Sequence, residues 1–183
     1  MPGAASVTMT NALFFQMPKD GSVIGSGAGS VGTAALFGSP GARYDARRLG
    51  WIGSLNSEVG MVVAWHLANV KSAADLFVKP LIVGGSGATD GNVIFPNTIA
   101  QQQMGRPVFA PPDIPAERLA ALRQGFEAMM RDPQVLADAE SHHIEINQPM
   151  PGAEIERLIQ HLHGFPPSLV AQAAQAIRPA ARP

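Results

Sequence analysis

The sequence predicts a single α/β domain with a mostly parallel sheet, followed by a run of C-terminal helices. Short apolar segments are twice followed by a glycine-rich loop and then by a helical segment, an order that is typical of parallel α/β packing. The chain also holds 19 glycines and 16 prolines in 183 residues, and this proportion favours many turns between short elements over a helical bundle. A chain of this length forms one domain with a sizeable core.

The composition excludes several classes of function. The 13 basic and 14 acidic residues give a net charge of −1, so we expect no nucleic-acid partner. Without cysteine, the chain has no disulfide, no thiolate metal site and no thiol nucleophile. The longest apolar stretch, residues 59–65, is far shorter than the roughly 20 residues that span a bilayer. Residues 1–17 contain no Lys or Arg, so we expect no signal peptide in this chain.

The first half of the chain alternates helical, strand and loop patterns. Apolar residues at helical spacing predict a helix over residues 4–17, which Pro18 ends. A short apolar run predicts a strand at 22–25, and a Gly/Ser loop then leads to a brief helix at 31–37. The further expected elements are strands at 49–55 and 59–65, a helix at 72–78 and a strand at 81–83.

The second half begins with one more strand and continues in helices. The strand is expected at 106–110, where Pro111 and Pro112 end it. Pro115 then stands where a proline favours the first turn of a helix. This helix carries an apolar stripe of Leu119, Leu122, Phe126, Met129 and Met130. Three more helices are expected at 133–140, 153–162 and 167–177.

Residues 27–32 read GAGSVG and match the dinucleotide fingerprint G-x-G-x-x-G after a predicted strand. A dinucleotide-binding unit also needs an acidic residue about 20 positions downstream, at the end of a second strand. The nearest acidic residue is Asp45, in a turn, and the helix expected at 31–37 is short for a crossover. A nucleotide-binding α/β protein therefore stays a less favoured alternative to a plain tight loop.

A second glycine-rich loop, residues 84–91, precedes a helix that runs towards Gln103. Successive small residues let backbone N–H groups converge on a ligand, and the helix N-terminus favours an anion. Ser86 and Thr89 offer hydroxyl donors, whereas Asp90 would repel an anion unless its side chain caps the helix. Two interpretations remain open: a carboxylate or phosphate site, or residues that only cap the helix.

The side chains that usually carry catalysis are not arranged for it in this sequence. His142 and His143 are adjacent and His161 and His163 are two apart, so neither pair has the i, i+4 spacing of helical metal ligands. No G-x-S-x-G motif supplies a nucleophilic serine. We therefore expect no enzyme, no metal and no cofactor. The two tryptophans, Trp51 and Trp65, lie in strand candidates and are expected in the core.

Several motifs, taken together and in order, resemble one family. They are PKDG at 18–21 with VIG at 23–25, YDARR at 44–48, WIGSLN at 51–56, VGGSG at 83–87, MGRP at 104–107, FAPP at 109–112, IPAER at 114–118 and MRDP at 130–133. With these motifs the chain is similar to the substrate-binding receptors of tripartite tricarboxylate transporters, the Bug or TctC-like proteins.

The resemblance implies a periplasmic-binding-protein-like (type II) lobe. Residues 1–103 would form a partial ligand-binding lobe, and residues 104–183 a returning strand and C-terminal helices packed on that lobe. The family's first strand and most of its second lobe have no counterpart here. The resemblance further implies a periplasmic protein that closes around a small solute and delivers it to a membrane permease.

The resemblance also assigns the binding residues. Ser86, Gly87, Ala88, Thr89 and Asp90 match the family's helix-opening loop, which holds a carboxylate of a di- or tricarboxylate or an acidic amino acid. Weaker candidates for the rim of the pocket are Gly27 and Ala28 after the first strand, and Asn56 and Ser57 after the next one. The alternative is a structural or interaction remnant that binds no solute and pairs through its exposed surface.

Overall fold

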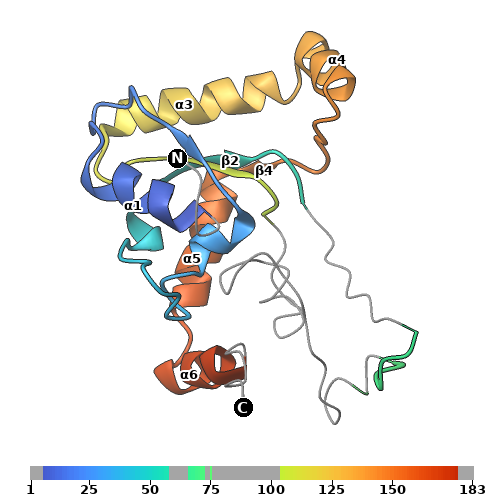
Figure 1. Cartoon of the computed structure of the whole chain (residues 1–183). Helices are drawn as coiled ribbons and strands as arrows, with labels where there is room; N and C mark the ends of the chain where they lie inside the picture. Colours follow the sequence, from blue (N-terminus) through green and yellow to red (C-terminus); the bar gives the residue numbers. More distant parts are fainter. Residues whose placement is uncertain (1–5, 58–65, 73–74, 76–103, 177–183) are drawn as a thin grey trace.

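The computed structural model describes residues 6–57, 66–72, 75 and 104–176. These residues form three layers, with a small sheet in the middle (Figure 1). Helices α1 (Val7–Phe15) and α5 (Gly152–His163) cover one face of the sheet, and α3 (Ala116–Met129) covers the other. Two short 3₁₀ helices, η2 (Gly29–Gly32) and η3 (Ala46–Arg48), lie on the side of α1 and α5.

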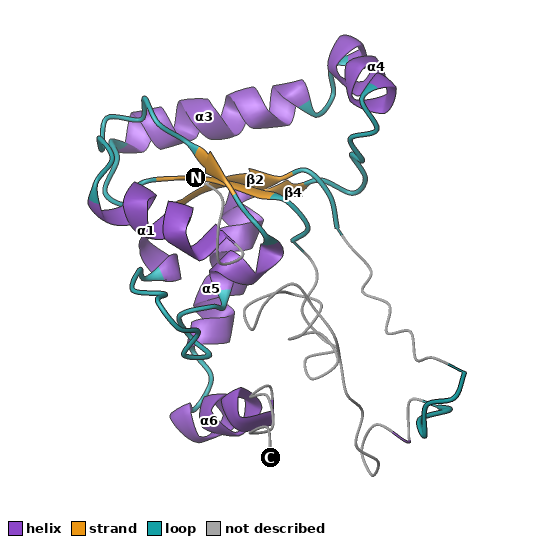
Figure 2. Cartoon of the chain, in the orientation of Figure 1, coloured by secondary structure: helices purple, strands orange, loops and turns teal. Residues whose placement is uncertain are grey.

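The sheet has four short strands in the order β1-β3-β2-β4 (Figure 2). They are β1 (Gly25–Ser26), β2 (Gly50–Ser54), β3 (Pro107–Ala110) and β4 (Met150–Pro151). Each pair of neighbours is antiparallel. The prediction of a periplasmic-binding-protein-like lobe with a mostly parallel sheet is therefore wrong.

The position of β3 explains this correction. The order of strand, glycine-rich loop and helix indicated strands that run in one direction, and β1 and β2 do run in the same direction. They are not neighbours, however, because β3 lies between them and runs opposite to both. A strand that comes later in the chain thus replaces the expected parallel pairing with two antiparallel ones.

A β-bulge in β2 distributes its side chains between the two faces. Trp51 pairs with Phe109, but Gly53 pairs with the next residue of β3, Val108, so that Ile52 is the additional residue. Trp51 and Phe109 belong to the core cluster beneath α1 and α5, whereas Ile52 belongs to the cluster beneath α3. The sheet therefore has an apolar core on each face.

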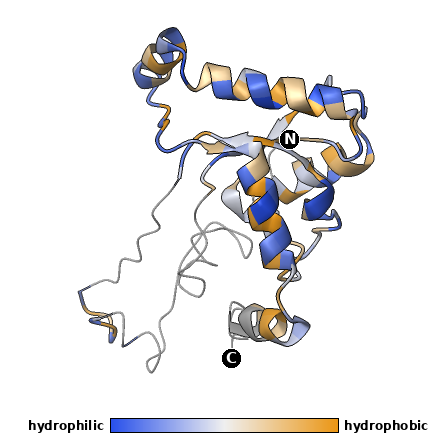
Figure 3. Ribbon diagram, turned by 180° about the vertical axis from the view of Figure 1, so that it is seen from behind, coloured by the Kyte–Doolittle hydropathy of each residue, from blue (hydrophilic) through white to orange (hydrophobic). Residues whose placement is uncertain are grey.

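The larger core lies between the sheet, α1 and α5. The rings of Trp51 and Phe109 are fully buried there, with centroids 5.3 Å apart. Ile155 and Ile159 of α5, spaced four apart, are also fully buried, as one apolar face of a helix requires. The prediction that Trp51 is a core residue is confirmed; Trp65 lies outside the described residues. Figure 3 shows hydrophilic and hydrophobic residues alternating along α3 and α5.

The smaller core lies between the sheet and α3. Phe126 and Met130 are buried against Ile52 and Ala110, with Leu119 and Leu122 partly buried beside them. Helix α3 begins at Ala116, directly after Pro115, so the predicted helix is confirmed. Four residues of its predicted apolar stripe belong to this core, whereas the fifth, Met129, is 38% exposed.

The other C-terminal helices also lie where the sequence predicts them. Helix α4 (Pro133–Ser141) begins after Asp132, whose carboxylate accepts a hydrogen bond from the backbone N–H of Gln134. Helix α5 and helix α6 (Pro167–Ala176) agree with the predicted ranges to within one residue at each end. Within the residues that the structure covers, none of these helices has the length and apolarity that a membrane span requires.

Two of the predicted N-terminal elements differ from the observed ones. The strand expected at 22–25 is observed at Gly25–Ser26, and the helix expected at 31–37 is a single 3₁₀ turn followed by further turns. The helix expected at 4–17 is confirmed as α1. The strands expected at 59–65 and 81–83, the loop at 84–91 and nearly all of the helix at 72–78 lie outside the described residues.

Candidate functional site

The predicted rim residues meet at one edge of the sheet. Gly27 and Ala28 follow β1, and Asn56 and Ser57 follow β2. Because both strands are antiparallel to β3, their carboxyl ends lie at the same edge. The start of β3 lies between them. We call Gly27, Ala28, Asn56 and Ser57 the strand-end edge.

Backbone hydrogen bonds to the start of β3 hold this edge together. The N–H of Gly27 donates to the carbonyl oxygen of Pro107 (3.1 Å), and the N–H of Gly105 donates to that of Asn56 (2.9 Å). Asn56 is 2% exposed, and its carbonyl oxygen also accepts from the hydroxyl of Ser54 (3.1 Å). Gly27 and Asn56 are therefore both tied to the start of β3, although they come from two separate parts of the sequence.

Two further backbone donors at the strand-end edge, besides the N–H of Gly27, also have protein acceptors. The N–H of Ala28 donates to the hydroxyl oxygen of Ser6 (3.1 Å). The N–H of Ser57 donates to Asn147, reaching the backbone oxygen at 3.1 Å and the side-chain oxygen Oδ1 at 3.3 Å. A carboxylate at this edge would have to replace one of these acceptors or take its donors from another segment.

The other predicted ligand residues belong to the segment between Ser57 and Met104. Ser86, Gly87, Ala88, Thr89 and Asp90 lie outside the described residues. The chain leaves the sheet after Ser57 and returns to it at Met104, next to the hydrogen bond between Gly105 and Asn56. The segment 58–103, which includes the predicted ligand loop, therefore starts and ends at the strand-end edge.

The glycines of the GAGSVG motif serve packing between protein segments. A Cβ atom on Gly29 would collide with the carbonyl oxygen of Met104, and one on Gly32 would collide with the side chain of Ile159. The motif also opens only η2, a four-residue 3₁₀ helix, whereas the dinucleotide fingerprint opens an α-helix. Close contacts between segments account for the glycines, and the geometry does not favour a nucleotide.

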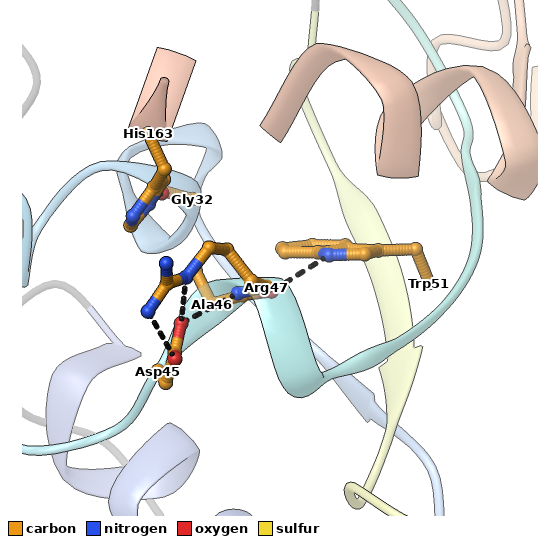
Figure 4. A network of polar contacts seen from close by, with 6 residues as sticks. All are labelled: Gly32, Asp45, Ala46, Arg47, Trp51 and His163. Carbon is orange, nitrogen blue, oxygen red and sulfur yellow. Dashed lines mark hydrogen bonds and ion pairs between the residues drawn. The ribbon is translucent and has the colours of Figure 1, made fainter. Parts of the chain in front are cut away.

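A polar network lies next to this loop (Figure 4). The carboxylate of Asp45 accepts hydrogen bonds from the backbone N–H (3.0 Å), Nε (3.0 Å) and Nη2 (2.8 Å) of Arg47. These side-chain hydrogen bonds hold the pKa of Asp45 below its usual value. Trp51 Nε1 donates to the carbonyl oxygen of Ala46 (3.0 Å), so the network fixes η3 beside the core.

Two further polar side chains act on the same structural region. Buried Tyr44 donates its hydroxyl hydrogen to the carbonyl oxygen of Val31 (2.9 Å), and burial raises the pKa of this phenol. His163 Nε2 lies 3.3 Å from the carbonyl oxygen of Gly32. Both residues support the chain around η2. Among the described residues, no group of three His, Asp or Glu side chains is placed to hold a metal ion.

The structure also contains a groove that the sequence analysis did not single out. It has a volume of about 690 Å³ and lies between α3 and the β1 side of the sheet. Its lining is mostly apolar and includes Ile24, Ile52, Val108, Leu122 and Met129. A signal was present in the sequence: Arg118, Ala121, Gly125 and Met129 recur at helical spacing beside the apolar stripe of α3.

No protein-family model, no curated protein and no solved structure matches this chain. The likeness to the receptors of tripartite tricarboxylate transporters therefore stays a resemblance of motifs. The binding role that it implies is accordingly a proposal.

Proposed function

We propose that the chain is a solute-binding receptor of the tripartite tricarboxylate type, which binds a small carboxylate-bearing solute. The solute would be a di- or tricarboxylate or an acidic amino acid, held by backbone and hydroxyl donors of residues 86–90. Such a receptor works in the periplasm and delivers its solute to a membrane permease.

The observation that carries this proposal is the geometry of the strand-end edge. Gly27 and Ala28 lie at the same sheet edge as Asn56 and Ser57. The segment that contains Ser86 and Thr89 starts and ends at this edge. Two of the three stretches that the motif resemblance assigns to one pocket thus meet at one place in the fold, and the third belongs to the segment that joins Ser57 to Met104. Binding residues commonly lie on loops that a rigid sheet positions, and such loops supply backbone donors.

The proposal is tested by thermal denaturation and calorimetric titration of the 183-residue chain. The probes are succinate, citrate and glutamate, and succinamide serves as the uncharged control. A ligand at 100 times its Kd adds about 2.7 kcal/mol to the free energy of unfolding. This raises the Tm of a domain of this size by several degrees. We expect at least one carboxylate to produce such a shift and succinamide to produce none.

Variants locate the binding residues. Ser86→Ala and Thr89→Ala each remove a hydroxyl donor, and a hydrogen bond to a charged group contributes about 1.5–3 kcal/mol. Each substitution is therefore expected to weaken carboxylate binding about tenfold or more. Ser141→Ala, at an exposed position on α4, is the matched control. A melt that no carboxylate moves, or Ser86→Ala and Thr89→Ala variants that bind like the wild type, would contradict the proposal.

A further inference from the structure

The apolar groove exists because α3 covers the sheet unevenly. Phe126 of α3 packs on the centre of the sheet, against Ile52 of β2. The outer strand β1 receives less cover: Ile24, just before it, is 52% exposed and lines the groove. A half-exposed isoleucine in a groove leaves apolar surface in contact with water. A ligand that covers this surface would gain free energy from its burial.

The helix wall of the groove is formed by a stripe with small residues in its middle. Arg118, Ala121, Gly125 and Met129 are spaced three and four apart and all line the groove, as one face of a helix requires. Apart from the adjacent residues and the backbone of α3 itself, no atom lies within 4 Å of the position that a Cβ on Gly125 would occupy. The groove is therefore open along its middle, and larger side chains at Ala121 or Gly125 would fill it.

The lining contains one charged residue, Arg118, at the end of the groove where α3 begins. Its side-chain stem lies beside Gly21: a Cβ on that glycine would be 3.1 Å from Cβ of Arg118. Within the described part of the chain, its guanidinium makes no ion pair within 4 Å. The nearby carboxylate of Asp20 accepts hydrogen bonds from the backbone N–H (2.9 Å) and the hydroxyl (2.6 Å) of Ser22, and these bonds, with a smaller contribution from the charge of Arg118, lower the pKa of Asp20. One cation thus stands at the end of an apolar groove whose lining has no carboxylate.

We propose that this groove binds an amphipathic carboxylate, with its long apolar body between α3 and β1 and its carboxylate on Arg118. Three observations carry the proposal. The volume of about 690 Å³ lies in the range of small-molecule sites. The lining is mostly apolar, with Ser26 as its uncharged polar side chain and the one charged residue, Arg118, at its end, where it can fix the orientation of a ligand. The charge of Arg118 complements a carboxylate, which a planar guanidinium binds in a bidentate manner.

This site is distinct from the function proposed above. The strand-end edge lacks a long apolar surface, and the groove lacks the cluster of backbone donors that a small polar dicarboxylate needs. Because the ligands differ in their apolar length, one titration series separates the two sites: succinate probes the first and dodecanoate probes the second.

The test is calorimetric titration of the 183-residue chain with dodecanoate, below its micelle concentration, and with 1-dodecanol as the uncharged ligand of equal length. Arg118→Gln is expected to weaken dodecanoate binding about tenfold, because a charge-assisted hydrogen bond is lost. The same variant should change 1-dodecanol binding less than twofold. Arg131→Gln, which removes an exposed arginine outside the groove, is the control and should change neither.

A second variant tests the body of the groove. Gly125→Leu places a side chain in open space and replaces glycine with a better helix former, so the variant is expected to fold at least as well as the wild type. It should abolish the binding of both ligands. Ala120→Leu, at an exposed position of the same helix that does not line the groove, should leave the binding of both unchanged.

Sedimentation of the ligand-free protein tests whether a second copy of the chain, rather than a carboxylate, occupies the groove. A dimer that becomes monomeric in Gly125→Leu but not in Ala120→Leu would show that a second copy covers the groove and would overturn the proposal. It would equally be overturned if the wild type binds no dodecanoate, or if Gly125→Leu binds it as the wild type does.

Discussion

At the scale of single residues, several glycines stand where two segments approach so closely that no side chain fits. A Cβ on Gly53 of β2 would collide with the ring of Phe126, and one on Gly152 at the start of α5 would collide with the carbonyl oxygens of Trp51 and Ile52. These glycines allow α3 and α5 to pack directly on β2. Gly125 differs, because it lies in an exposed part of α3 and faces open space.

This difference predicts opposite effects of one substitution on stability. Gly125→Ala is expected to raise the free energy of unfolding by about 1 kcal/mol, because alanine is the better helix former and nothing obstructs its methyl group. Gly53→Ala is expected to lower the free energy of unfolding by about 1–3 kcal/mol, because the ring of Phe126 must shift out of its place. Denaturant titrations of both variants measure these values. If both substitutions changed the free energy of unfolding in the same direction, the different packing roles of Gly53 and Gly125 would be refuted.

At the residue scale, the burial of single side chains could be predicted from the sequence, but the packing roles of the glycines could not. Most of the apolar stripe of α3 and the burial of Trp51 follow from local periodicity and residue type, and the core positions of Leu119, Leu122, Phe126, Met130 and Trp51 are confirmed. The role of Gly53 does not follow, since the ring that needs the space belongs to Phe126, far along the chain. The GAGSVG motif is a second example. Its glycines make room for neighbouring protein segments, but in the sequence they look the same as glycines that make room for the phosphates of a nucleotide.

At the scale of elements, the helices could be predicted and the direction of the strands could not. Helices α3, α4, α5 and α6 have proline or a capping side chain at their start and local apolar patterns, all of which are visible in sequence. Strand pairing depends on non-local partners: β1 and β4 have only two residues each, and a strand so short has almost no pattern of its own. The insertion of β3 between β1 and β2 decided that the sheet is antiparallel.

The side chain of Arg123 links three elements: α3, β2 and α5. Arg123 of α3 donates from Nε to the carbonyl oxygen of Trp51 (2.8 Å) and from Nη2 to Glu156 of α5 (2.9 Å). Strand β4 pairs only with Gly53 and Ser54, so the arginine reaches β2 beyond the end of that pairing. The side chain of Arg123 is 22% exposed and that of Glu156 is 48% exposed. The bond to the carbonyl is thus the more sheltered of the two.

We therefore expect Arg123→Met to lower the free energy of unfolding by about 1–3 kcal/mol, because a sheltered carbonyl oxygen loses its charged donor. Glu156→Gln should lower it by less than about 1 kcal/mol, because half-exposed ion pairs contribute little. The matched pair separates the two bonds of Arg123, and chemical denaturation at low and high salt measures both. If Glu156→Gln were as damaging as Arg123→Met, the ion pair with α5, rather than the hydrogen bond to the β2 carbonyl, would be the main contribution of Arg123 to stability.

At the scale of the whole molecule, both core clusters are built from residues on either side of segment 58–103. The larger cluster joins residues 7–51 to 104–159, and the smaller one joins Ile52 to residues 110–130. The sequence could not reveal this arrangement, because the residues that pack together in each core cluster lie far apart along the chain. What it did identify were the four residues of the strand-end edge, which the sheet brings together. The predicted ligand loop lies outside the described residues.

This arrangement predicts that the sheet and its helices fold without segment 58–103, whereas solute binding requires it. The change is to replace residues 58–103 with about four Gly and Ser residues, enough to connect Ser57 and Met104, whose neighbours Asn56 and Gly105 are joined by a 2.9 Å hydrogen bond. The shortened chain retains Trp51 as its single tryptophan, since Trp65 is removed, and Trp51 is fully buried. We expect a cooperative melt with blue-shifted emission from Trp51.

In the shortened chain, citrate, succinate and glutamate should no longer raise the melting temperature, because Ser86 and Thr89 are absent. Dodecanoate should still bind, because every residue that lines the groove is retained. Replacing the same segment with a scrambled sequence of equal length controls for chain length. Loss of the cooperative melt in the shortened chain would mean that segment 58–103 contributes to the core itself. A carboxylate response that survives the replacement would place the solute site within the sheet and helices rather than in residues 86–90.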